Sequence, residues 1–148
     1  MSEPHSIRVA FIDDEAEIRR ATAQSLSLAG LEAILFDSGE AALAAIGSDF
    51  DGGVISDIRM PGIDWLELFR RLSERDPDLP VILISGHSDI ATAVAAVQRG
   101  AYDFLAKPFQ ADRLIATAKR ALEKRQLVLE NRNLRAQAGA LLEAGPLL

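Results

Sequence analysis

Five short apolar runs alternate along this chain with five stretches of amphipathic helical pattern. The runs cover about residues 7–12, 32–36, 53–56, 81–84 and 103–106, and the helical stretches cover about 15–29, 39–47, 65–75, 89–99 and 111–136. Runs without polar alternation, such as 9–12 and 81–84, are typical of strands buried on both faces. The alternation therefore predicts an α/β domain whose five-stranded parallel sheet is covered by helices on both faces, with right-handed crossovers.

Composition excludes several classes of protein. The chain has 148 residues, enough for one domain with a hydrophobic core. Its net charge of −6 argues against direct nucleic-acid binding, and the absence of cysteine excludes disulfides and thiolate metal sites. Residues 1–6 lack a signal-peptide core, and no stretch approaches the length of a membrane span. We expect a cytoplasmic protein without membrane contact, with an extended or disordered segment at residues 1–6.

Acidic and basic side chains follow three of the apolar runs. Asp13 and Asp14 follow the first run, Asp57 ends the third, and Lys107 follows the fifth. Parallel α/β sheets bring the carboxyl ends of their strands to one crevice. We therefore expect these four side chains to lie close together.

Carboxylates held this close favour a hard divalent cation. Two of them about 4 Å apart repel by about 4 kcal/mol at an effective dielectric constant of about 20, and magnesium prefers one or two carboxylates with water and phosphate oxygens. We expect Asp14 and Asp57 to bind the ion directly, and Asp13 directly or through water. Taken alone, the Asp13-Asp14 pair fits a helix cap better. With Asp57 and Lys107 at matching strand ends, the pattern indicates a phosphoryl group delivered with magnesium.

Four motifs in order resemble those of a known family. They are Phe11-Ile12-Asp13-Asp14-Glu15, Ser56-Asp57-Ile58-Arg59-Met60-Pro61-Gly62, Ile84-Ser85-Gly86, and residues 100–109. Over about residues 7–122 the chain resembles the response-regulator receiver domain of two-component signalling, and most of all the NtrC-type regulators of sigma-54-dependent transcription. The resemblance implies a doubly wound, flavodoxin-like (βα)₅ fold with strand order 2-1-3-4-5 and an extended last helix. Residues 7–122 would form the receiver domain, and residues 123–148 a linker helix and tail.

The same resemblance implies roles for single residues. Asp57 would accept a phosphoryl group from a sensor histidine kinase, while Lys107 and Ser85 would contact the phosphoryl oxygens. The magnesium ligands would be Asp13, Asp14, Asp57 and the backbone carbonyl of Arg59. Such a chain is not an enzyme beyond catalysing its own phosphoryl transfer and dephosphorylation.

Further expectations concern the switch and two departures from the family. Ser85, where threonine is commoner, would move toward the phosphoryl group and Tyr102 would rotate into the vacated space; the alternative for Tyr102 is a half-buried core aromatic. The family uses a cis bond between Lys107 and Pro108 to aim the lysine. Trp65 stands where glycine is usual, and would either crowd the approach to the acceptor or cover the rim of the third helix.

The last helical stretch is longer than the sheet requires. At about 1.5 Å per residue it reaches about 40 Å, against about 17 Å for a five-residue strand. Leu127, Leu134 and Leu141 recur every seven residues beside a parallel pair, Leu122 and Leu129, which indicates a short coiled coil and a homodimer. The alternative is that Leu122 and Leu129 cover the domain while Leu134 and Leu141 belong to a frayed tail. By resemblance, the full-length protein would add ATPase and DNA-binding domains.

Three other functions were weighed. A magnesium-dependent phosphatase or mutase with an aspartate nucleophile resembles D-x-D-x-T sequences, and residues 13–17 read Asp-Asp-Glu-Ala-Glu instead. A receiver-like interaction module that no longer accepts phosphate is disfavoured because all the expected polar groups are present, and Trp65 is the one feature that favours it. A nucleotide-binding fold would carry a glycine-rich phosphate loop, and the chain has none.

Overall fold

The computed structural model describes residues 7–48 and 50–143. A five-stranded parallel sheet forms its centre, in the order β2-β1-β3-β4-β5. The strands are β1 (Ile7–Ile12), β2 (Leu31–Phe36), β3 (Gly53–Asp57), β4 (Val81–Ser85) and β5 (Asp103–Ala106). The predicted fold class and strand order are confirmed, and each strand begins and ends within one residue of the predicted run.

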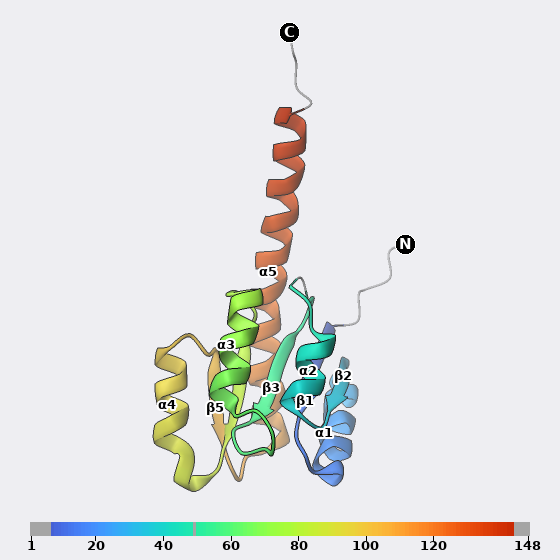
Figure 1. The fold of residues 1–148 in the computed structure, drawn as a ribbon. Helices are drawn as coiled ribbons and strands as arrows, with labels where there is room; N and C mark the ends of the chain where they lie inside the picture. The colour runs from blue at the N-terminus through green and yellow to red at the C-terminus, as the bar shows by residue number, and fades with distance from the viewer. Residues whose placement is uncertain (1–6, 49, 144–148) are drawn as a thin grey trace.

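Helices cover both faces of the sheet (Figure 1). One face carries α1 (Ala16–Leu28) and α5 (Ala111–Glu143), and the other carries α2 (Gly39–Ala45), α3 (Trp65–Arg75) and α4 (Ile90–Gln98). Alternate strand residues point to opposite faces, so Val9 and Phe11 pack toward α1 and α5 while Ala10 and Ile12 pack toward α2, α3 and α4. Both faces of the sheet are therefore apolar, which explains the unbroken apolar runs in the sequence.

Local signals set the helix boundaries. The Ser38 hydroxyl accepts a hydrogen bond from the backbone N–H of Ala41 at 3.1 Å and caps α2, as its position predicts. Gly30 and Gly100 follow α1 and α4 with φ of 84° and 116°, a left-handed conformation that favours glycine. A short 3-10 helix, η1 (His87–Asp89), precedes α4 and was not predicted.

The last helix continues further than its sequence pattern indicates. α5 runs for 33 residues to Glu143, about 50 Å in length, and projects past the sheet (Figure 1). Leu122 is only 2% exposed and belongs to the core on the α1–α5 face. The prediction that Leu122 contributes to a dimer seam is therefore wrong, because its side chain is already packed inside the domain. Leu127 and Leu134 are 67% and 57% exposed, and Leu129 is half-buried.

Some predictions lie outside the described residues. They concern the extended or disordered segment at 1–6 and the tail at 144–148. The same holds for the side chain of Leu141. Across the described part of the chain, the helices are too short or too polar to cross a membrane.

Candidate functional site

The carboxyl ends of β1 and β3 bring Asp13 and Asp57 side by side. Ile12 pairs with Ser56 in the parallel register, so the next residue on each strand is Asp13 or Asp57. Neighbouring strands lie about 4.8 Å apart. The two acidic positions, distant in sequence, thus meet at one edge of the sheet as predicted.

Asp57 is held by a lysine on one side and a backbone amide on the other. It is 7% exposed. Lys107 Nζ donates to Asp57 Oδ2 at 2.8 Å, and the backbone N–H of Arg59 donates to Asp57 Oδ1 at 3.0 Å. Burial lowers the pKa of Lys107, but the hydrogen bond and the charge of Asp57 outweigh burial and leave that pKa raised. A cis peptide bond joins Lys107 to Pro108, as the resemblance implies, and the Lys107 ammonium contacts the Asp57 carboxylate.

Asp13 is a buried carboxylate of the site with a hydrogen-bond donor at only one of its two oxygens, among the described residues. It is 1% exposed. Its Oδ1 accepts the backbone N–H of Glu15 at 2.9 Å, while Oδ2 is buried and has no hydrogen-bond donor among the described residues. Burial raises the pKa of Asp13, the Glu15 amide lowers it, and the neighbouring charge of Asp57 raises it further. A buried carboxylate oxygen without a donor favours a cation as its partner.

Two exposed carboxylates complete an oxygen cluster around Asp13. Asp13, Asp14 and Glu15 each present an oxygen within 4.8 Å of the others, and a hard cation such as magnesium takes oxygen ligands. The residues present therefore fit magnesium. Glu15 was not predicted as a ligand. It occupies the N-cap position of α1 without a side-chain cap, so the alternative that Asp13 or Asp14 serves as the cap of this helix is wrong.

Asp57 stands beside this cluster and does not belong to it. Both of its oxygens already accept hydrogen bonds, from Lys107 and from the Arg59 amide. Its predicted share in binding magnesium therefore stays a prediction, as does that of the Arg59 carbonyl.

The hydroxyl of Ser85 lies at the end of β4, beside the acceptor strand. Ser85 is fully buried, and its Oγ donates to the Gly86 carbonyl at 2.9 Å. Asp57 pairs with Ile84, so Ser85 is one residue beyond the acceptor in the register. Ser85 is thus placed where a short movement of the loop would change its partner.

Tyr102 lies too far from Ser85 to act with it. The Tyr102 amide donates to the Val81 carbonyl at 2.8 Å, at the start of β4. Four strand residues separate Val81 from Ser85, about 13 Å, and the Tyr102 ring packs on the α1–α5 face beneath Lys124. The prediction that Tyr102 fills the space left by Ser85 is wrong, and the alternative of a half-buried core aromatic holds.

Phe104 is the aromatic residue that shares a face with Ser85. It pairs with Leu83 in β5 and packs, partly buried, against the core under α2, α3 and α4. Alternate residues share a face of a strand, so Leu83 and Ser85 point to this same side. Alternation alone does not separate Phe104 from Tyr102, which is two residues earlier; Phe104 lies inside β5, whereas Tyr102 precedes its first residue, Asp103.

Two more side chains lie near the site: that of Arg59, for which the sequence predicted no role, and that of Trp65, for which it left two interpretations open. The Arg59 guanidinium donates to both carboxylate oxygens of Asp89, at 2.7 and 3.1 Å, and to the Ser88 hydroxyl at 2.9 Å. It therefore joins the loop after β3 to the start of α4. Trp65 opens α3 and packs against the core on the α2–α4 face, which supports the interpretation of this ring as a cover for the helix rim.

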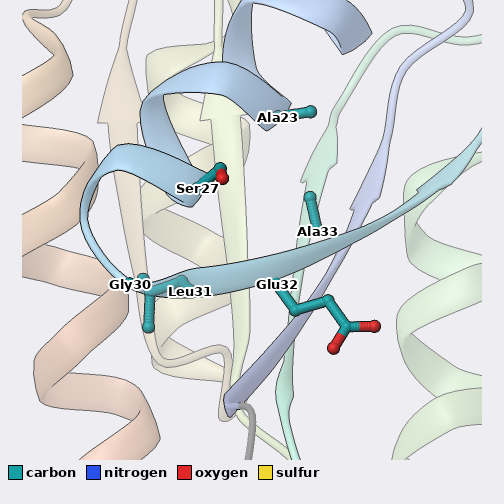
Figure 2. Close-up of a pocket in the computed structure, with 6 residues that line it drawn as sticks. All are labelled: Ala23, Ser27, Gly30, Leu31, Glu32 and Ala33. Carbon is teal, nitrogen blue, oxygen red and sulfur yellow. The ribbon is translucent and has the colours of Figure 1, made fainter.

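A hollow between α1 and β2 lies at the opposite end of the sheet. It is lined by Ala23, Ser27, Gly30, Leu31, Glu32 and Ala33 (Figure 2). Leu31 pairs with Ile7, at the start of β1, and the Glu32 carboxylate points away from α1 (Figure 2). This hollow is therefore separate from the acidic edge.

Comparison with known proteins decides the family. The family model described as the response regulator receiver domain matches residues 9–119. The chain belongs to this family. The receiver domain is of the type found in NtrC and DctD regulators. The chain is 56% identical over 140 residues to the C4-dicarboxylate transport transcriptional regulatory protein DctD of Rhizobium meliloti. The alignment covers 95% of this chain and 30% of that protein. The chain is 42% identical over 123 residues to the DNA-binding transcriptional regulator NtrC of Salmonella typhimurium, covering 83% and 26%.

Solved structures agree with this assignment. The receiver domain of NtrX from Brucella abortus is 46% identical, with a TM-score of 0.73 over 78% of this chain and 98% of that chain. A longer NtrX structure, in complex with ADP, is 44% identical, with a TM-score of 0.78 over 87% of this chain and 30% of that chain. The receiver spans less than a third of the length of the DctD and NtrC regulators named above.

Proposed function

We propose that this receiver accepts a phosphoryl group on Asp57 from a sensor histidine kinase, with magnesium bound at the neighbouring acidic cluster. The observation that carries the proposal is the pairing of a buried Asp57, 2.8 Å from Lys107 Nζ, with Asp13, whose Oδ2 has no donor among the described residues. Asp13 Oδ2 favours a cation, and Lys107 can bind an anion if it exchanges its bond to Asp57. A phosphoryl group with magnesium supplies both.

The chemistry is an in-line displacement. A carboxylate oxygen of Asp57 forms a bond to phosphorus while the bond from phosphorus to the kinase histidine nitrogen breaks, and the imidazole leaves. Such transfers depend on positioning and charge neutralisation more than on covalent catalysis. When bound, magnesium supplies part of that neutralisation at Asp13, Asp14 and Glu15. Lys107 supplies the rest by exchanging its bond to Asp57 for one to a phosphoryl oxygen.

The proposed switch uses residues on the α2–α4 face. A phosphoryl group adds about −1.5 to −2 charges and three acceptor oxygens. Ser85 exchanges the Gly86 carbonyl for one of these oxygens, and Phe104 occupies the space that opens on the same face. The Arg59–Asp89 ion pair, at 2.7 Å, ties the resulting movement to the start of α4.

Dimerisation and output form the second part of the proposal. Leu127 and Leu134, exposed on the projecting part of α5, would meet a second copy of the chain in a short coiled coil. The relatives are regulators of transcription. The full-length protein would therefore couple this receiver to ATPase and DNA-binding domains, and the receiver would bind no nucleic acid itself.

Incubation with acetyl phosphate and Mg²⁺, followed by intact-mass analysis, tests the acceptor. We expect one acid-stable, base-labile phosphoryl group on the parent chain and on the control Asp37→Asn, whose exposed carboxylate follows β2 at the same edge. The variant Asp57→Asn should gain none. Turnover of many equivalents without an adduct would instead support a phosphatase, and neither turnover nor adduct would support an interaction module that is not phosphorylated.

A further inference from the structure

A buried carboxylate at the other end of the sheet binds two arginines of α5. Asp76 ends α3 and is 2% exposed. Arg125 Nη2 donates to its Oδ2 at 2.7 Å. Arg132 donates from Nη1 to Oδ2 at 2.9 Å and from Nη2 to Oδ1 at 2.6 Å. We call Asp76, Arg125 and Arg132 the Asp76 clamp.

The clamp joins α5 to two separate loops. Arg125 is fully buried and also donates from Nε and Nη2 to the Phe50 carbonyl, at 3.0 and 2.8 Å, in the loop after α2. Arg132 reaches Asp78 Oδ2 at 3.0 Å in the loop after α3. A guanidinium that donates to both oxygens of one carboxylate fixes direction as well as distance. The helix is thereby held on the domain at the point where it leaves the sheet.

The clamp occupies one face of α5, and the exposed leucines occupy the opposite one. Arg125 and Arg132 are seven residues apart, so at about 100° per residue they point in nearly the same direction. Leu127 and Leu134 follow each arginine by two residues and point about 200° away. They are exposed because the opposite side of the helix is bound to the domain.

We propose that Asp76 is a positioning residue that sets the direction and rotation of α5 beyond Leu122, where the helix leaves the core, and so decides which side of the helix meets a second copy of the chain. This inference rests on the proposed dimer for its consequence, whereas the rotation itself is a property of one chain. Asp78 lacks this role, because it is exposed and the bond it accepts from Arg132, at 3.0 Å, reaches one of its oxygens.

The first test measures the rotation and spread of α5 within one chain. The chain has no cysteine, so Ala44→Cys on α2 and Gln137→Cys on α5, both at exposed positions, accept a pair of spin labels. Labelled chain is diluted in unlabelled chain, and the distance distribution is measured by double electron–electron resonance. We expect one narrow distribution in the parent and in Asp78→Asn, and a broadened or shifted one in Asp76→Asn. An unchanged distribution in Asp76→Asn would overturn the inference, whether or not the chain dimerises.

The second test determines which face of α5 contacts a second copy of the chain. Leu134→Cys lies on the outward face, and Ala136→Cys lies near the clamp side, at an exposed position. In the parent we expect disulfide cross-linking between chains at 134 to exceed that at 136. In Asp76→Asn the ratio should fall about tenfold, which corresponds to about 1.4 kcal/mol of lost preference. An unchanged ratio would refute the inference, and no cross-linking at either position in the parent would refute the dimer while leaving the distance measurement decisive.

Both tests need a folded variant. Arg132→Gln is the second variant, because Arg132 is partly exposed and its removal leaves the buried Arg125–Asp76 pair intact. Far-UV circular dichroism and a cooperative thermal unfolding transition check the fold of each variant, whether or not the chain accepts a phosphoryl group. A role for Asp76 in loop stability alone would lower the melting temperature and leave both the distance distribution and the cross-linking ratio at their parent values.

Discussion

Replacing Asp13 by asparagine should stabilise the magnesium-free protein. Asparagine keeps an oxygen to accept the Glu15 amide, now 2.9 Å from Oδ1, and removes the negative charge from a side chain that is 1% exposed. Two carboxylates about 5 Å apart repel by about 3 kcal/mol at an effective dielectric constant of about 20. Lys107 offsets part of this repulsion, so we expect a net gain in the free energy of unfolding of about 1–2 kcal/mol.

Thermal unfolding in EDTA measures this gain. For a chain of this size 1 kcal/mol corresponds to about 2–4 °C, so the melting temperature of Asp13→Asn should exceed that of the parent by about 2–8 °C. Asp37→Asn is the matched control, because it removes an exposed carboxylate that follows β2 at the same edge. Its melting temperature should stay within about 1 °C of the parent value.

Magnesium should reverse the order of the two proteins. A ligand at about one hundred times its dissociation constant stabilises the folded state by about 2.7 kcal/mol, and the parent should gain this amount while Asp13→Asn gains little. If Asp13→Asn is less stable than the parent in EDTA, Asp13 is not a source of repulsion. If magnesium stabilises both proteins equally, Asp13 is not a ligand. Either result would refute part of the reasoning about this edge.

Four more outcomes follow from the same contacts. Lys107→Gln removes the cation beside Asp57 and should slow phosphorylation by acetyl phosphate by about 10²-fold, measured as the rate of mass gain. Asp76→Asn should lose about 3–5 kcal/mol in urea unfolding at pH 7. Burial raises the pKa of Asp76, but the hydrogen bonds from its two arginines outweigh burial and hold that pKa far below its ordinary range. The stabilisation that the ionised Asp76 contributes is therefore present above about pH 4 and should shrink as the pH falls below it. The double variant Leu127→Gln, Leu134→Gln should raise the dimer dissociation constant by at least about 10²-fold in sedimentation, since burial of each leucine contributes about 1.5–3 kcal/mol. Ser38→Ala should cost about 1 kcal/mol in thermal unfolding through the lost cap of α2.

The sheet and the main residues of the site could be predicted because both depend on local pattern. Unbroken apolar runs predict strands buried on both faces, and a parallel sheet brings their carboxyl ends together. Asp13, Asp57 and Lys107 therefore fell at one edge before any coordinates were known. The end of α5 was missed because residues 136–140 are small or polar and carry no apolar periodicity.

The predictions from sequence were wrong or incomplete where a residue could lie on either face of the sheet, or where its partner is distant in the sequence. Tyr102 and Phe104 are both aromatic and differ by two residues, and their packing on opposite faces depends on where β5 begins. Glu15 enters the acidic cluster only because α1 starts after it. The clamp joins Asp76 to partners 49 and 56 residues away, and no local pattern in the sequence links such positions.

The two ends of the sheet hold buried aspartates in opposite electrostatic states. Asp13 lacks a donor for one oxygen and has its pKa raised by burial, so its end of the sheet gains free energy when a cation arrives. Asp76 is bound by two guanidiniums, and they lower its pKa despite its burial, so this carboxylate needs no metal cation. A change at Asp57 would therefore move Ser85, Phe104 and the α4 side of the domain, while the clamp keeps α5 fixed on the other face. We infer that the projecting helix serves as the reference against which the α4 surface moves.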